Sequence, residues 1–98
     1  MRRRITLEDH RQVKEITDAE LVEPTRRGDD GKAFGSLVIR HQRMVIAVAH
    51  ALLGEASEAE DMAQEAFLRA YINLPALKDS TKLAPWLRRI ACIAAGNG

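Results

Sequence analysis

The longest regular pattern in the sequence is a helical repeat that follows the turn-forming letters GDDG and ends at Leu53. Over five turns, side chains that share one helix face recur every three or four residues, at Phe34, Leu37, Val38, His41, Met44, Val45, Val48 and Leu52. Other apolar residues spread onto a second side, at Ile39, Ile46 and Ala47. We therefore predict a central core helix, capped by Asp29 or Asp30, that is covered by more than one neighbour.

A second helical pattern runs from Ser57 to Leu74 and carries small side chains on its apolar stripe. The stripe consists of Ala59, Met62, Ala63, Ala66, Phe67, Ala70 and Leu74. Ser57 and Glu60 stand three residues apart, which is the spacing of a capping box at a helix start. Pro75 blocks continuation because proline lacks an amide hydrogen. We predict a helix between these two signals.

Two shorter helices flank this pair. Thr17 or Asp18 can cap a helix that ends at Arg27, although Pro24 lies beyond its first turn and should kink or end it. Near the C-terminus, Ser80 or Thr81 can cap a last helix. Its apolar stripe comprises Leu83, Leu87, Ile90, Ala91 and Ala94.

These patterns predict the fold class and the domain organisation. Ninety-eight residues make one small domain, and no segment shows the alternation of a half-buried strand. The prediction is an all-α fold, a compact bundle of about four helices over residues 17–98. Residues 1–16 are highly charged without a clean period, so we expect a flexible basic N-terminal arm, either disordered or touching phosphates through its arginines.

Composition excludes several classes of protein. No run of about 18 apolar residues exists, so no membrane insertion is expected. A single cysteine, Cys92, excludes an internal disulfide and fits a reducing cytoplasm. His41 lies on the apolar face of the central helix and is expected to be a satisfied, partly buried histidine. None of the three histidines is paired with other ligand types at metal-binding spacing, so we predict no metal site and no cofactor. No constellation of reactive side chains points to an enzyme.

Charge is distributed unevenly along the chain. Residues 54–74 carry one basic and five acidic side chains, a net charge of −4, whereas residues 75–98 carry four basic and one acidic, a net charge of +3. The acidic helix is therefore followed by a basic terminal segment. This polarity favours one surface for a basic protein and another for nucleic acid.

Beside the apolar stripe of the acidic helix, Asp61, Gln64 and Glu65 share one face because their spacings are three and four residues. Leu68 extends that patch by one turn. Such a face suits docking to a basic helical partner, but it is also the ordinary solvated outside of a helix. Spacing alone leaves both interpretations open.

The basic segment presents a polar loop and a tryptophan. Lys78, Lys82, Arg88 and Arg89 can contact phosphates, and Asp79, Ser80 and Thr81 can bond to a base edge. Trp86 is either a core or boundary residue or a flat surface on which a base could stack.

Taken in order, the segments AELV, RRGDDGKAFGSLVIRHQRMV, EAEDMAQEAFLRAY and LAPWLRRIA resemble the second conserved region of bacterial RNA polymerase sigma factors of the extracytoplasmic-function (ECF) type. The resemblance covers residues 18 to about 91, and its most specific parts are AEDMAQEAF (59–67) and WLRRIA (86–91).

The resemblance implies a role for each surface. The family's polymerase-docking residues match Asp61, Gln64 and Glu65, with Leu68 beside them, and would contact the clamp helices of the largest subunit of core RNA polymerase. The segment from Leu77 to Arg89 would recognise and melt the minus-ten promoter element by capturing a flipped base of the non-template strand in the loop before the last helix. We rank that loop above Trp86 for base contact.

The sequence departs from the family pattern in three places. The first helix carries Pro24 where the family usually continues a helix, and Cys92 and Ile93 replace the usual Arg and Asn after WLRRIA. We also expect no counterpart of the family's second, helix-turn-helix domain. A different reading remains open, a helical protein-interaction module that binds an anti-sigma factor without DNA contact. An anti-sigma factor is an expected partner in either case.

Overall fold

A computed structural model describes residues 16–96, and the predicted basic arm therefore lies almost entirely outside the described residues. Four α-helices follow one another: α2 (Asp18–Arg27), α3 (Lys32–Leu53), α4 (Ala56–Asn73) and α5 (Leu83–Ala94). Two short 3-10 turns, η1 (Leu74–Ala76) and η2 (Ser80–Lys82), lie between α4 and α5. No strand occurs within residues 16–96. The predicted all-α bundle of about four helices is thus confirmed.

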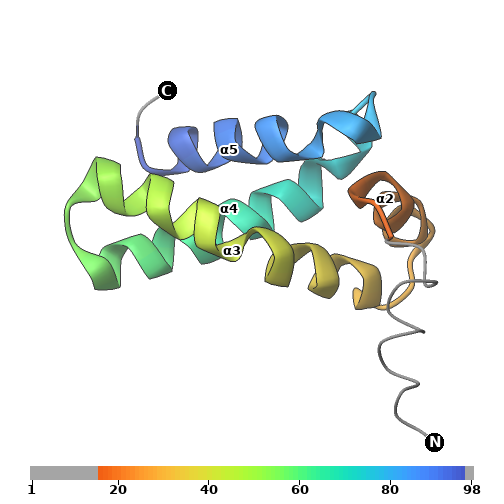
Figure 1. Ribbon diagram of the computed structural model, residues 1–98, viewed down its shortest axis with the longest axis horizontal. Coiled ribbons are helices and arrows are strands. Elements are labelled where there is room, and N and C mark those ends of the chain that lie inside the picture. The colour runs from red at the N-terminus through yellow and green to blue at the C-terminus, as the bar shows by residue number, and fades with distance from the viewer. Residues whose placement is uncertain (1–15, 97–98) are drawn as a thin grey trace, which may run out of the picture.

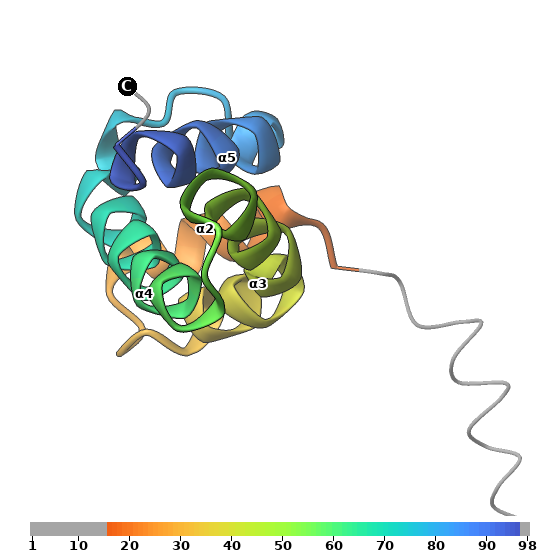
Figure 2. The ribbon, with the colours of Figure 1, turned by 90° about the vertical axis from the view of Figure 1, so that its left-hand side faces the viewer.

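Helices α3, α4 and α5 run side by side along the molecule, and α2 lies at one end of the bundle, near the α4–α5 connection (Figure 1). Helix α3 packs against each of the other three helices, as the two-sided apolar pattern predicts. The view along the bundle shows α4 and α5 each beside α3 (Figure 2). Helix α2 also contacts η1 and η2, which brings the first helix against the segment before the last one.

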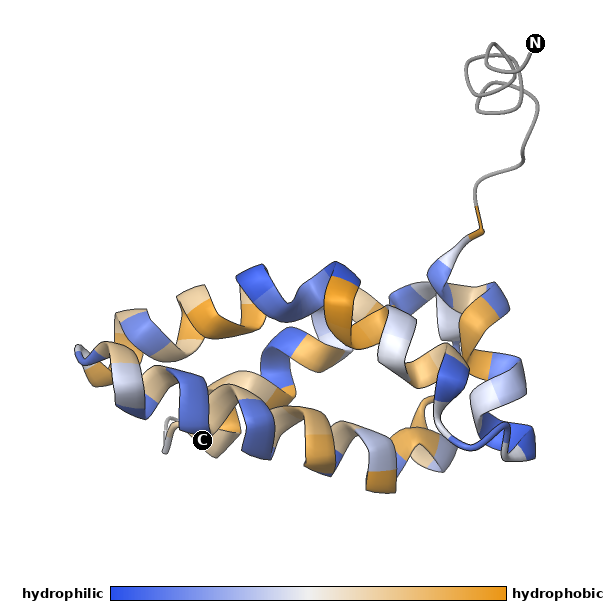
Figure 3. Ribbon diagram, turned by 90° about the horizontal axis from the view of Figure 1, so that it is seen from below, coloured by the Kyte–Doolittle hydropathy of each residue, from blue (hydrophilic) through white to orange (hydrophobic). Residues whose placement is uncertain are grey.

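Two clusters of buried side chains form the core. The first joins α3, α4 and α5 and consists of Val45, Ala63, Ala66, Phe67, Ala70, Leu87 and Ala91. The second joins α2 and α3 to the α4–α5 connection and consists of Val22, Leu37, Leu74, Leu77 and Leu83. Phe34 and Trp86 are partly buried and pack against both clusters, so each of them links the two halves of the core. Bands of apolar and polar residues alternate along the helices, as amphipathic packing requires (Figure 3).

The predicted apolar stripes are confirmed with two exceptions. Ala59, Ala63 and Ala66 are fully or almost fully buried, and Phe67 makes an edge contact with Phe34 at 6.5 Å between ring centroids. On α3, however, Leu52 is 42% exposed and Ile39 is 71% exposed. The second apolar side of α3 is therefore covered only in part: Ile46 packs against the first core cluster, whereas Ala47, like Ile39, is exposed.

The predicted caps of two helices, α4 and α5, differ in the structure. Helix α4 begins at Ala56, so Ser57 already lies inside the first turn; its hydroxyl donates to the Glu55 carboxylate at 3.1 Å, and the N-cap residue Glu55 makes no side-chain capping bond. Helix α5 is preceded by Lys82 rather than capped by Ser80 or Thr81. Those two residues instead form η2 together with Lys82, and the Asp79 side chain caps that turn by accepting from the Thr81 amide.

At the other two helix starts the predicted residues act as caps. The Thr17 hydroxyl accepts from the Glu20 amide at 3.1 Å, and the Glu20 carboxylate accepts from the Thr17 amide at 2.9 Å. Asp29 accepts from the Ala33 amide at 2.9 Å, although Gly31 is the formal N-cap of α3. Helix α2 ends at Arg27, as predicted, and it continues through Pro24, so the proline does not end the helix.

Within residues 16–96 no helix is long and apolar enough to cross a membrane.

Candidate functional site

The predicted acidic face, defined as Asp61, Gln64, Glu65 and Leu68, lies on the outer side of α4, opposite its buried alanines. Asp61 and Gln64 are exposed, and Leu68 is 55% exposed. Glu65 is half-buried, and its carboxylate accepts from the Arg69 guanidinium at 3.0 Å. That ion pair partly neutralises Glu65, so Asp61 presents the stronger negative charge to an approaching partner.

The structure adds one residue to this face that the sequence reasoning missed. Ile72 is 64% exposed and stands four residues after Leu68, which places it on the same side of α4. The signal that could have found it is the same spacing rule that united the other four residues. With Ile72, the acidic face ends in an exposed apolar strip one turn longer than predicted.

The polar loop, residues 78–82, is held at both ends by the core. Leu77 and Leu83 flank the loop and are 5% and 2% exposed, whereas Lys78, Asp79, Thr81 and Lys82 are exposed. The five intervening residues therefore project from two buried anchors. This arrangement presents their side chains to solvent while it limits the paths that the backbone can take.

A network around Asp79 orders the loop. One Asp79 carboxylate oxygen, Oδ1, accepts from the Thr81 hydroxyl at 2.6 Å and from the Thr81 amide at 3.0 Å. These bonds, the hydroxyl first and the amide second, hold the pKa of Asp79 below its ordinary value of 3.8, because both donors favour the ionised carboxylate. Asp79 Oδ1 is thus occupied within the loop, and the Thr81 hydroxyl keeps only its acceptor lone pairs for a ligand.

The basic side chains of this region all lie at the surface. Arg88 and Arg89 are exposed on α5, and Lys78 and Lys82 are exposed at the two ends of the loop. We call these four residues the basic surface. Trp86 is half-buried against both core clusters. Of the two interpretations of Trp86, its partial burial favours a boundary residue, and base stacking on it stays a prediction.

The histidine on the apolar side of α3 behaves as predicted. His41 is half-buried, and its Nε2 lies 2.9 Å from a carboxylate oxygen of Asp18, whose other oxygen accepts from Arg40 at 3.2 Å. These contacts tie the start of α2 to the middle of α3. Across the described part of the chain, no group of three or more His, Cys, Asp or Glu side chains could hold a metal ion.

The comparisons with known proteins assign the family. The model of the family "Sigma-70 region 2" matches residues 37–92. RNA polymerase sigma-H factor of Pseudomonas aeruginosa is 39% identical over 80 residues, which cover 82% of this chain and 41% of that protein. ECF RNA polymerase sigma-E factor of Escherichia coli is 36% identical over 84 residues, which cover 86% of this chain and 43% of that protein.

A solved structure agrees with the sequence relatives. The NMR structure of an engineered region 2 of sigmaE in complex with GTAAAA matches with a TM-score of 0.78 and 36% identity, and the match covers 87% of each chain. The chain belongs to the sigma-70 region 2 family, and its named relatives are of the ECF type. It spans about two-fifths of the length of the curated relatives that it matches.

Proposed function

We propose that this chain is the part of a transcription initiation factor that docks on core RNA polymerase and recognises and melts the minus-ten promoter element. The carrying observation is the likeness to an engineered sigmaE region 2 that was solved in complex with GTAAAA. The polar loop between two buried leucines supports this proposal. It carries two exposed lysines, and two exposed arginines follow on α5, so cations for phosphates lie near polar side chains that could bond to a base.

The DNA contacts are tested with single strands. A pool of hexamers with randomised bases, together with GTAAAA, is presented to the purified chain at several salt concentrations. We expect enrichment of defined sequences. A plot of log K against log salt should have a slope no steeper than about −3, because each of four phosphate contacts contributes roughly −0.7. Lys82→Ala and Arg89→Ala should each lower that slope by about 0.7.

The matched control is Arg43→Ala, which removes an exposed cation of α3 that lies outside the basic surface. Its salt slope should equal that of the original chain. If no hexamer binds at low salt, or if every sequence binds equally, the assignment of the polar loop to the minus-ten element is wrong, and the alternative of a protein-interaction module without DNA contact gains.

The acidic face is our proposed site for the clamp helices of the largest polymerase subunit. We expect Asp61→Ala and Gln64→Ala each to weaken binding to core polymerase by roughly tenfold, whereas Glu65→Ala should cost less because Arg69 already pairs with that carboxylate. Leu68→Ala and Ile72→Ala extend the test to the apolar strip. Binding is measured by titration of labelled chain with core polymerase at two salt concentrations.

Glu60→Ala serves as the control for Asp61→Ala, because Glu60 is an exposed acid one residue away that points about 100° around the helix. Polymerase binding that survives Asp61→Ala and Gln64→Ala in folded protein would refute the docking site. A protein that covers this face, such as the anti-sigma factor that the family resemblance implies, would compete with polymerase for it.

A further inference from the structure

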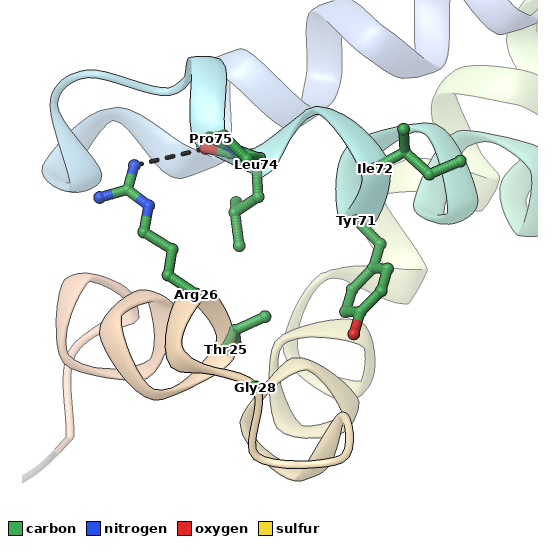
Figure 4. A pocket seen from close by; sticks show the side chains of 7 residues that line it. All are labelled: Thr25, Arg26, Gly28, Tyr71, Ile72, Leu74 and Pro75. Atoms are coloured by element: carbon green, nitrogen blue, oxygen red, sulfur yellow. Dashed lines mark hydrogen bonds between the residues drawn. The ribbon is translucent and has the colours of Figure 1, made fainter.

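One arginine makes side-chain hydrogen bonds between α2 and the segment before the polar loop. The Arg26 Nη2 atom donates to the backbone carbonyls of Leu74, at 3.3 Å, and of Leu77, residues that are 48 and 51 positions away in the sequence. Its other terminal nitrogen, Nη1, donates to the Glu23 carboxylate at 3.2 Å, within α2. The guanidinium is thus held by its own helix and reaches across to η1 (Figure 4).

The position of these carbonyls matters for the loop. The Leu77 carbonyl belongs to the peptide group that joins Leu77 to Lys78, the first residue of the polar loop. A bond to that carbonyl fixes the orientation of the peptide plane, and therefore the direction in which the chain leaves η1. The Leu74 carbonyl also accepts from the Leu77 amide at 3.0 Å, so Arg26 reinforces the last turn before the loop.

Apolar packing holds η1 against α2 on the inner side only. Val22 supports Leu74 and Leu77 from within the second core cluster. On the outer side, however, the space between the end of α2 and η1 is an open cleft of about 670 Å³, lined by Thr25, Arg26, Gly28, Tyr71, Ile72, Leu74 and Pro75. Figure 4 shows the Arg26 side chain crossing from α2 to η1, where it makes its hydrogen bond.

We propose that Arg26 is a positioning residue for the polar loop: it fixes the take-off of residues 78–82 from outside the DNA-contacting surface. The consequence for DNA binding rests on the proposed function, while the consequence for loop order does not. A charged donor to two carbonyls at once provides more restraint than a neutral side chain, and the planar fork of arginine suits it better than lysine. A pre-ordered loop loses less conformational entropy when it binds a base.

The first test needs no DNA. Backbone amide hydrogen exchange is measured on the full chain and on Arg26→Ala, Arg26→Lys and Arg27→Ala. Arg27 is the matched control, because it is exposed, carries the same charge and makes no ion pair or side-chain hydrogen bond within residues 16–96. We expect the Leu77, Thr81 and Lys82 amides to exchange roughly three- to tenfold faster in Arg26→Ala, the range that loss of about one hydrogen bond gives. Arg27→Ala should leave these rates unchanged.

Arg26→Lys keeps the charge and protects the interpretation if the alanine variant loses its fold. We expect lysine to restore the rates only in part. Unchanged exchange in both Arg26 variants would overturn the proposal, as would acceleration spread evenly over α3 and α4, which would indicate general destabilisation.

The second test separates positioning from direct contact with phosphate. Single-strand affinity of the Arg26 variants is measured against salt, with the hexamers described above. Positioning predicts roughly three- to tenfold weaker binding at every salt concentration with an unchanged slope. A slope lower by about 0.7 would show a direct phosphate contact and would refute the positioning role. If the original chain binds no single strand, the proposed function fails, and amide exchange alone decides the role of Arg26.

Discussion

At the scale of single residues, the Asp79 carboxylate bonds within the polar loop, although the sequence predicts a contact with a base. Asp79 was expected to bond to a base edge, and in the structure one of its oxygens holds Thr81 by two hydrogen bonds. The other Asp79 oxygen and the half-buried Ser80 stay predicted base contacts. A residue that orders its own loop constrains what its neighbours can offer to a ligand.

The pH dependence of the loop follows from the lowered pKa of Asp79. A carboxyl with a depressed pKa stabilises the folded loop fully above its ordinary value of 3.8, and this contribution is lost as pH falls through the lowered pKa. We therefore expect the Thr81 amide resonance to stay constant from neutral pH down to about pH 4 and to shift only below it. NMR titration of the original chain and of Asp79→Asn, which cannot titrate, checks this. A midpoint at or above 3.8 would contradict it.

At the scale of elements, α2 is the part of the fold that departs most from sequence rules. Pro24 removes a backbone donor in the helix interior, yet the helix continues, because a capping box starts it and Val22 is fully buried in the second core cluster. Tertiary contacts of α2 with α3, η1 and η2 thus override a local signal. The benefit is that the helix places Arg26 against η1.

Replacement of Pro24 should reveal what the proline costs. Pro24→Ala restores an amide donor and raises helix propensity, partly offset by a more flexible unfolded chain, so we expect the free energy of unfolding to rise by about 1–2 kcal/mol. Urea and thermal unfolding measure the change. Pro85→Ala is the matched control: Pro85 lies in the first turn of α5, where the amide has no partner within the helix, and its replacement should be nearly neutral. Equal effects at the two sites would contradict the account.

At the scale of the whole molecule, the core has two clusters, one between α3, α4 and α5 and one where α2 packs on the start of α3 and on the segment from η1 to Leu83. Phe34 and Trp86 link the two clusters. The proposed polymerase face lies on the outside of α4, and the proposed DNA loop extends from the second cluster. Because Ile72 lines the cleft beside η1, the apolar strip at the end of the acidic face reaches the segment that precedes the loop.

The sequence by itself determined the helices and their buried faces. Apolar spacing is a local property of the chain, so it predicted α3 to its last residue, the alanine stripe of α4 and the stripe of α5. It also placed Asp61, Gln64 and Leu68 on an exposed face. Local signals failed at two helix starts. Ser57 lies two residues past the N-cap position of α4, and Ser80 and Thr81 belong to a separate 3-10 turn before α5.

Only the tertiary structure decided which surfaces support the site. The bonds of Arg26 join residues 48 and 51 positions apart. Trp86 packs against two clusters whose residues come from all four helices and from the connection between α4 and α5. No periodicity encodes such meetings, because they arise when helices that are each locally specified pack on one another and bring distant backbone atoms within bonding distance.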